Sequence, residues 1–170
     1  MATTPAASST PALAFTPAFK RVAQSNDFDC AFACIATIAG KTLEEVRATA
    51  VKQFHLREHG PYWITEALIT SFAAHYGWTA TVWKEVLTPI IGLPDLAILM
   101  IDYDEETELG RHVVFHRIRQ ASPKPAIEYV IDPAYWVAAD KQITADLKAL
   151  APSWYIGLHP MNTPTTYAKK

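Results

Sequence analysis

The chain has 170 residues, of which 50% are hydrophobic and 19% are charged, and its formal net charge is −2. This length and composition fit one globular domain and are short for two. The balanced charge shows neither the basic excess expected of a nucleic-acid-binding protein nor a charged tail. We therefore expect any partner to be recognised by a local site and expect no nucleic acid among the partners.

Both ends of the chain are expected to lie outside the packed domain. Residues 1–20 are rich in Ala, Thr, Ser and Pro and lack the early positive charge and apolar core of a signal peptide, so they predict a flexible arm. Residues 160–170 predict a tail, which leaves 21–159 as the domain. Prolines, a glycine and an aspartate interrupt the longest apolar run, 87–101, so we expect no membrane insertion.

The first half of the domain predicts three helices. Asp29 is placed to cap a first helix that stops at Gly40. A Thr-x-x-Glu capping box at 42–45 starts a second helix. A third helix is expected over about 64–76, where apolar residues recur at helical spacing.

The second half predicts mostly strands, rich in β-branched and aromatic residues. The expected strands are 78–85, 96–103, 112–119, 127–131 and 154–158. The third and fourth of these form a natural hairpin, and a short helix is expected over 140–150. Helices followed by an antiparallel sheet predict an α+β fold, with the N-terminal helices packed on the C-terminal sheet.

The two cysteines, Cys30 and Cys34, lie one helical turn apart. A disulfide framework needs more cysteines at wider spacing, so we expect both thiols to be reduced and the protein to be cytoplasmic. A cysteine on an amphipathic helix is most often a small core residue, and we assign Cys34 to the core. Cys30 differs because it is expected in the first helical turn, where the helix dipole and free amides favour the thiolate.

Other residues complete a constellation for thiol chemistry around Cys30. Gln24 lies six positions upstream, and its side-chain amide can reach the oxyanion site that the Cys30 amide would face. His112 opens one strand of the expected hairpin and Asp132 closes the other, so the two would be neighbours, and Asp132 could fix the imidazole tautomer. His116 is about 13 Å farther along the same strand and is expected to be a packed or surface histidine.

The segment 24–34, QSNDFDCAFAC, resembles the active-site segment of the double-glycine leader peptidases. These are papain-like cysteine peptidases found on bacteriocin-exporting ABC transporters and as related free-standing domains. The family pattern is a Gln, five residues and a Cys that follows Asp and precedes an Ala-Cys pair. The segments 93–99, LPDLAIL, 112–115, HVVF, and 129–133, YVIDP, look similar as well, so the resemblance covers roughly 22–140.

The resemblance implies a papain-like fold in a free-standing bacterial domain. It implies Cys30 as nucleophile, His112 as base, Asp132 as the residue that orients the base, and Gln24 as oxyanion donor. This chain has Ala31 where the family usually has Gly directly after the cysteine, which bears on how closely a substrate approaches the backbone. We do not carry over a leader peptide ending in Gly-Gly as the substrate.

The sequence thus predicts a cysteine peptidase that cleaves a peptide or protein amide bond through a Cys-His-Asp triad, with no cofactor and no metal. Two alternatives stay open: a catalytically silent papain-like module that binds peptides, and a deamidase or acyltransferase that uses the same thiol. A third, minor alternative is a zinc peptidase, because residues 55–59, HLREH, match the His-x-x-Glu-His pattern. The substrate and the oligomeric state do not follow from the sequence.

Overall fold

Three α-helices form the first half of the described chain. The computed structural model describes residues 15–87 and 92–161. Its helices are α1 (Cys30–Ala39), α2 (Leu43–Phe54) and α3 (Glu66–His75). Gly40 ends α1 with a φ of 64°, a left-handed conformation that glycine adopts without steric cost. The capping box predicted for α2 is confirmed, because Thr42 and Glu45 each accept the other's backbone N–H with their side chains.

Within the described residues, seven strands form an antiparallel sheet. The strands are β1 (Trp78–Ala80), β2 (Lys84–Glu85), β3 (Leu96–Asp104), β4 (Leu109–Ile118), β5 (Ile127–Ile131), β6 (Ile143–Thr144) and β7 (Trp154–Pro160). Their order is β1-β7-β3-β4-β5-β6, with β2 also paired to β7. The predicted β4–β5 hairpin is confirmed, with Val114 opposite Ile131. The α+β class is therefore as expected.

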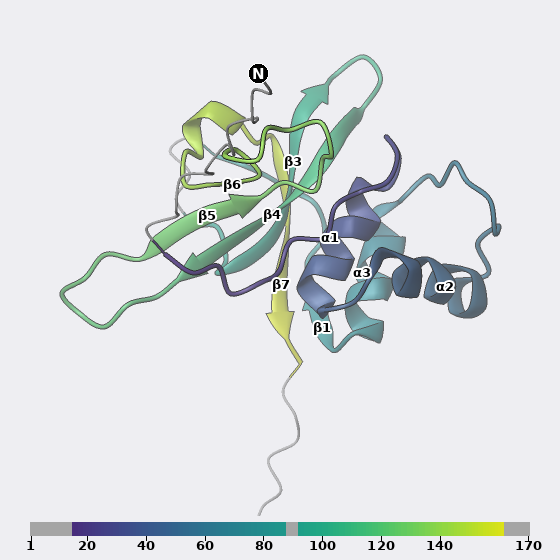
Figure 1. Cartoon of the computed structure of the whole chain (residues 1–170), viewed down its shortest axis with the longest axis horizontal. Coiled ribbons are helices and arrows are strands. Elements are labelled where there is room, and N and C mark those ends of the chain that lie inside the picture. Colours follow the sequence, from purple (N-terminus) through teal and green to yellow (C-terminus); the bar gives the residue numbers. More distant parts are fainter. Residues whose placement is uncertain (1–14, 88–91, 162–170) are drawn as a thin grey trace, which may run out of the picture.

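The helices gather on one side of the sheet (Figure 1), with α1 packed against β4. One core cluster joins the helices to this face and contains Phe32, Phe72 and Val114. A second cluster lies on the opposite face of the sheet and contains Val113 and Phe115. Adjacent residues of β4 therefore contribute to different clusters, because side chains alternate along a strand.

The prediction of a helix over residues 140–150 is wrong. Ile143 and Thr144 form β6, which pairs with β5, and Lys148–Leu150 form a short 3₁₀ helix, η1. Pairing with β6 satisfies the backbone groups along the edge of β5, and this gain outweighs the local helix preference. The strand predicted over 78–85 is divided into β1 and β2, which both pair with β7.

The arm predicted over 1–20 falls mostly outside the described residues, which begin at Phe15. Phe15 and Phe19 pack against the main core. The backbone N–H of Ala18 donates a hydrogen bond to the hydroxyl of Tyr129, at 2.8 Å. Packing therefore begins before the boundary that the composition predicts.

The tail predicted over 160–170 begins at the last residue of β7, and residues 162–170 lie outside the described part of the chain. Residues 88–91, inside the longest apolar run of the sequence, also lie outside it. Among the described residues, no helix has both the length and the apolar character needed to cross a membrane.

Candidate active site

Cys30 is the first residue of α1, and its side chain meets that of His112 on β4. The Sγ of Cys30 lies 3.1 Å from the Nδ1 of His112, and this contact joins residues 82 positions apart in the sequence. Each residue is 8% exposed. Because α1 packs on β4 through buried side chains, the core of the protein holds the pair together.

Burial sets the ionisation of this pair. Burial raises the pKa of the Cys30 thiol above its ordinary value, although the backbone amides at the start of α1 and the nearby Arg111 act in the opposite direction. Burial also lowers the pKa of His112 to about 4. Burial thus disfavours the charged form of each residue and favours a thiol beside a neutral imidazole. The helix start favours the thiolate as predicted, but desolvation outweighs it.

Asp132 is 2% exposed, and its carboxylate does not bond to the imidazole. Its Oδ2 accepts a hydrogen bond from Nη1 of Arg111 at 2.5 Å, and its Oδ1 accepts one from the backbone N–H of Ala134 at 2.9 Å. Among the described residues, no hydrogen bond joins His112 to Asp132. The hairpin brings the two backbones together as predicted, yet the carboxylate pairs with the residue before the histidine.

The alternation of side chains along β4 explains this pairing. Val114 faces the helices, so His112, two positions earlier, lies on the same face and reaches α1. Val113 lies on the opposite face, and Arg111, two positions before it, lies on that face as well. Asp132 follows β5 at the position opposite Val113 and therefore meets Arg111. No motif in the sequence singles out Arg111, although it stands directly before the predicted base.

Gln24 is 3% exposed and belongs to the loop that leads to Cys30. Its backbone N–H donates to the carbonyl of Pro133 at 2.9 Å, which ties this loop to the residue after Asp132. Its side-chain Nε2 donates to the carbonyl of Asn26 at 2.9 Å. An amide nitrogen carries two hydrogens, so one N–H of Gln24 remains for another acceptor.

Asp29 takes the N-cap position of α1, but its side chain makes no cap hydrogen bond. Its Oδ2 instead accepts from Oγ of Ser25 at 2.8 Å and from the guanidinium of Arg47 on α2. Arg47 also donates to Ser25 Oγ at 2.6 Å. The residue before Cys30 is thus anchored to α2 by an ion pair, a contact between distant segments that no sequence motif signals.

The other cysteine and histidine of these elements lie apart from the pair. Cys34 is fully buried in the main core, and burial raises the pKa of its thiol well above the ordinary value. The Nδ1 of His116 lies 2.9 Å from the hydroxyl of Tyr129. These positions agree with the packed roles predicted for both residues.

A cleft of about 390 Å³ opens onto Cys30 and His112. Its remaining lining comes from the loop before α1, from the first turn of α1, from residues 62–64 and from the β3–β4 hairpin. The other lining residues are Asp27, Phe28, Ala31, Tyr62, Trp63, Ile64, Asp102, Asp104, Thr107, Leu109, Gly110 and Arg111. Trp83 also packs near the imidazole, with ring centroids 5.7 Å apart. Cys30 therefore borders a space that can hold part of a peptide.

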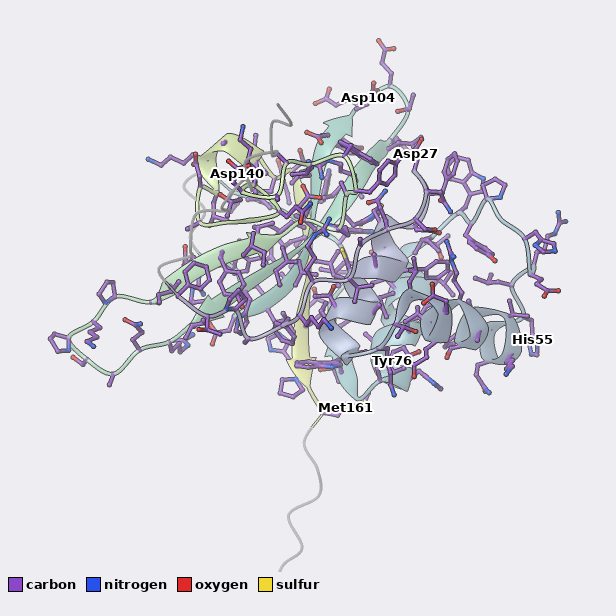
Figure 2. All side chains as sticks on the ribbon, viewed as in Figure 1. Asp27, His55, Tyr76, Asp104, Asp140 and Met161 are labelled. Atoms are coloured by element: carbon purple, nitrogen blue, oxygen red, sulfur yellow. The ribbon has the colours of Figure 1, made fainter. Side chains whose placement is uncertain are left out.

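The His-x-x-Glu-His motif does not form a zinc-peptidase site. His55 is the C-cap of α2 with a φ of 56°, so the chain leaves the helix there and the two histidines do not share a helical face. In residues 15–87 and 92–161, no three His, Cys, Asp or Glu side chains are grouped to hold a metal ion. Figure 2 shows His55 at the right edge of the molecule, apart from Asp27, which lines the cleft.

Comparison with known proteins identifies the fold. No family model and no curated protein matches the sequence. Eight chains of solved structures match. One is described as "a double glycine motif protease from AMS/PCAT transporter in complex with the leader peptide". It aligns with a TM-score of 0.54 at 14% identity, over 84% of this chain and 92% of that chain. At this identity the likeness shows that the chain shares the fold of a protease domain.

Proposed function

We propose that this protein is a thiol-dependent peptidase with Cys30 as nucleophile and His112 as base. The observation that carries the proposal is the 3.1 Å contact between Cys30 Sγ and His112 Nδ1, two residues that line an open cleft. A nucleophile and a base within hydrogen-bonding reach are the first requirement of covalent catalysis. The fold shared with a double-glycine protease supports the same assignment.

Burial favours the neutral form of both residues, so the proposed proton transfers begin from a thiol and a neutral imidazole. His112 Nδ1 takes the thiol proton as Cys30 Sγ attacks the substrate carbonyl, and the imidazolium then gives that proton to the leaving amine. The acyl group remains on Cys30 as a thioester. Water attacks the thioester while His112 accepts the water proton, and the thiol recovers that proton when it leaves. The backbone N–H of Cys30 and the spare N–H of Gln24 are the proposed oxyanion donors, each worth roughly 10²–10³ in rate.

Asp132 is the proposed third member of the site, as the family resemblance implies. Its present contacts favour an indirect role, because Arg111 precedes His112 on β4 and its ion pair with Asp132 anchors this end of the strand. To orient the imidazole directly, the Asp132 carboxylate would have to give up its hydrogen bond from Arg111 and accept one from His112 instead. This pairing is also the observation that favours the silent peptide-binding module, because a base without an orienting partner is a weaker catalyst.

A thiol-directed probe and a peptide library test the proposal. We expect Cys30→Ala to abolish both probe labelling and cleavage, whereas Cys34→Ala, one turn along the same helix, retains most of each. Mass spectrometry of the products distinguishes hydrolysis from deamidation and from acyl transfer to an amine. Equal labelling of wild type and Cys30→Ala would reject Cys30 as the nucleophile. Peptide binding without any product would favour the silent module.

A further inference from the structure

The cleft above Cys30 has an acidic rim. Asp27 lies on the loop before α1, and Asp102 and Asp104 lie on the β3–β4 hairpin. Figure 2 shows Asp27 and Asp104 at the same end of the molecule, on these two separate segments. Arg111 is the one Lys or Arg among the described residues that line the cleft. Carboxylates from two separate segments therefore line the same cleft as Cys30.

Arg111 compensates only part of this charge, because its guanidinium pairs with Asp102 on the rim and with the buried Asp132. In the part of the chain that the structure describes, no ion pair involves Asp27 or Asp104. Two backbone N–H groups of the hairpin turn donate to Asp104 at 2.8 and 3.0 Å, and they lower the pKa of its carboxyl. Asp27 accepts a hydrogen bond from the Tyr135 hydroxyl at 2.9 Å. The cleft thus keeps a net negative charge beside the thiol.

Large apolar side chains are exposed in the same cleft. Phe28 is 54% exposed, Trp63 is 68% exposed and Leu109 is 47% exposed. Exposed apolar side chains that gather around a cleft indicate a surface that a ligand covers. Aromatic faces beside carboxylates suit the side chains of Lys and Arg, whose aliphatic stems pack on the rings while the cation reaches the acids.

We infer that the segment recognised in this cleft is a basic one, with a lysine or arginine within a few residues of the bond presented to Cys30 and an apolar residue beside it. The basic side chain lies between Asp27 and Asp104, and the apolar side chain packs on Phe28 and Trp63. This inference deepens the proposed function and rests on it for the position of the scissile bond. Neutral or acidic peptides of the same shape lose the attraction, and acidic ones are repelled.

Peptide binding tests the inference without requiring turnover. Fluorescent peptides that differ only by Lys, Gln or Glu at one position are titrated into the full chain carrying Cys30→Ala. We expect the Lys peptide to bind roughly five- to tenfold more tightly than the Gln peptide at low salt, because exposed ion pairs have modest strength. The preference should largely vanish near 1 M salt, where the Debye length is about 3 Å. Equal affinities for all three peptides at low salt would overturn the inference.

Variants that remove single charges test which carboxylates produce the preference for the Lys peptide. Asp27→Asn and Asp104→Asn keep an acceptor oxygen for the local hydrogen bonds, and together they should remove the preference for Lys. Glu106→Gln is the matched control, since it removes the same charge from the same hairpin but does not line the cleft. A preference for Lys that survives the double substitution, or that Glu106→Gln removes equally, would refute the assigned carboxylates.

Parallel cleavage assays of wild type separate this inference from the proposed function. Cleavage with no preference among the three peptides refutes the inference and keeps the peptidase. A preference for Lys in binding, with no cleavage of any peptide, keeps the inference and refutes the peptidase.

Discussion

The ion pair between Arg111 and Asp132 should dominate the stability of the candidate site. The Asp132 side chain is 3% exposed, and among the described residues its carboxylate accepts hydrogen bonds from Arg111 and from one backbone N–H. Arg111→Gln therefore leaves a buried carboxylate with one neutral donor, and removing one partner of a buried pair costs about 3–5 kcal/mol. Asp132→Asn leaves Arg111 with Asp102 and with solvent contact, because its side chain is 22% exposed. We expect this second change to cost about 1–2 kcal/mol.

A double-mutant cycle measures the interaction. The double variant should cost much less than the sum of the single changes, with a coupling free energy of about 2–3 kcal/mol. Urea unfolding followed by tryptophan fluorescence gives each free energy, provided that the m-value is unchanged. Arg119→Gln is the matched control, since its partner Asp95 is 43% exposed and surface pairs contribute about 0–1 kcal/mol. If Arg111→Gln lowers the free energy of unfolding by no more than Arg119→Gln does, the reasoning is refuted.

Two further variants report on His112 and on the wall of the cleft. Burial lowers the pKa of His112 to about 4, below its ordinary value of 6.5, so between these pH values the unfolded chain binds a proton that the folded chain does not. We expect stability to fall by up to about 3 kcal/mol as the pH drops through this window, and His112→Asn should flatten that dependence in urea unfolding; an unchanged slope would contradict the assignment. Gly110→Ala would place a Cβ 2.7 Å from the Met100 side chain. We expect a loss of about 1–3 kcal/mol by thermal unfolding, and an unchanged melting temperature would show that the wall yields freely.

The sequence predicts local structure correctly wherever a few neighbouring residues decide it. Gly40 and the Thr42–Glu45 box mark helix ends because their interactions lie within one turn of the chain. The α+β class and the hairpin of β4 and β5 follow from residue patterns in the same way. The placement of Cys30 at the start of a helix belongs with them, since Asp29 precedes it in the N-cap position.

Contacts between distant segments needed the tertiary structure. Residues 140–150 could form a helix alone, but the open edge of β5 takes Ile143 and Thr144 as a strand. Asp29 looks like a helix cap in sequence, yet the guanidinium of Arg47 on α2 provides a stronger, charged partner.

The side-chain pairing and the ionisation of the candidate site also depend on the tertiary structure. The sequence by itself determined that a cysteine, a histidine and an aspartate would come from α1, β4 and the end of β5. The tertiary structure decided that Cys30 meets His112 while Asp132 meets Arg111, because adjacent residues of a strand point to opposite faces of the sheet. It also decided the directions of both pKa shifts, which favour the neutral thiol and imidazole, because desolvation depends on how completely the fold buries them.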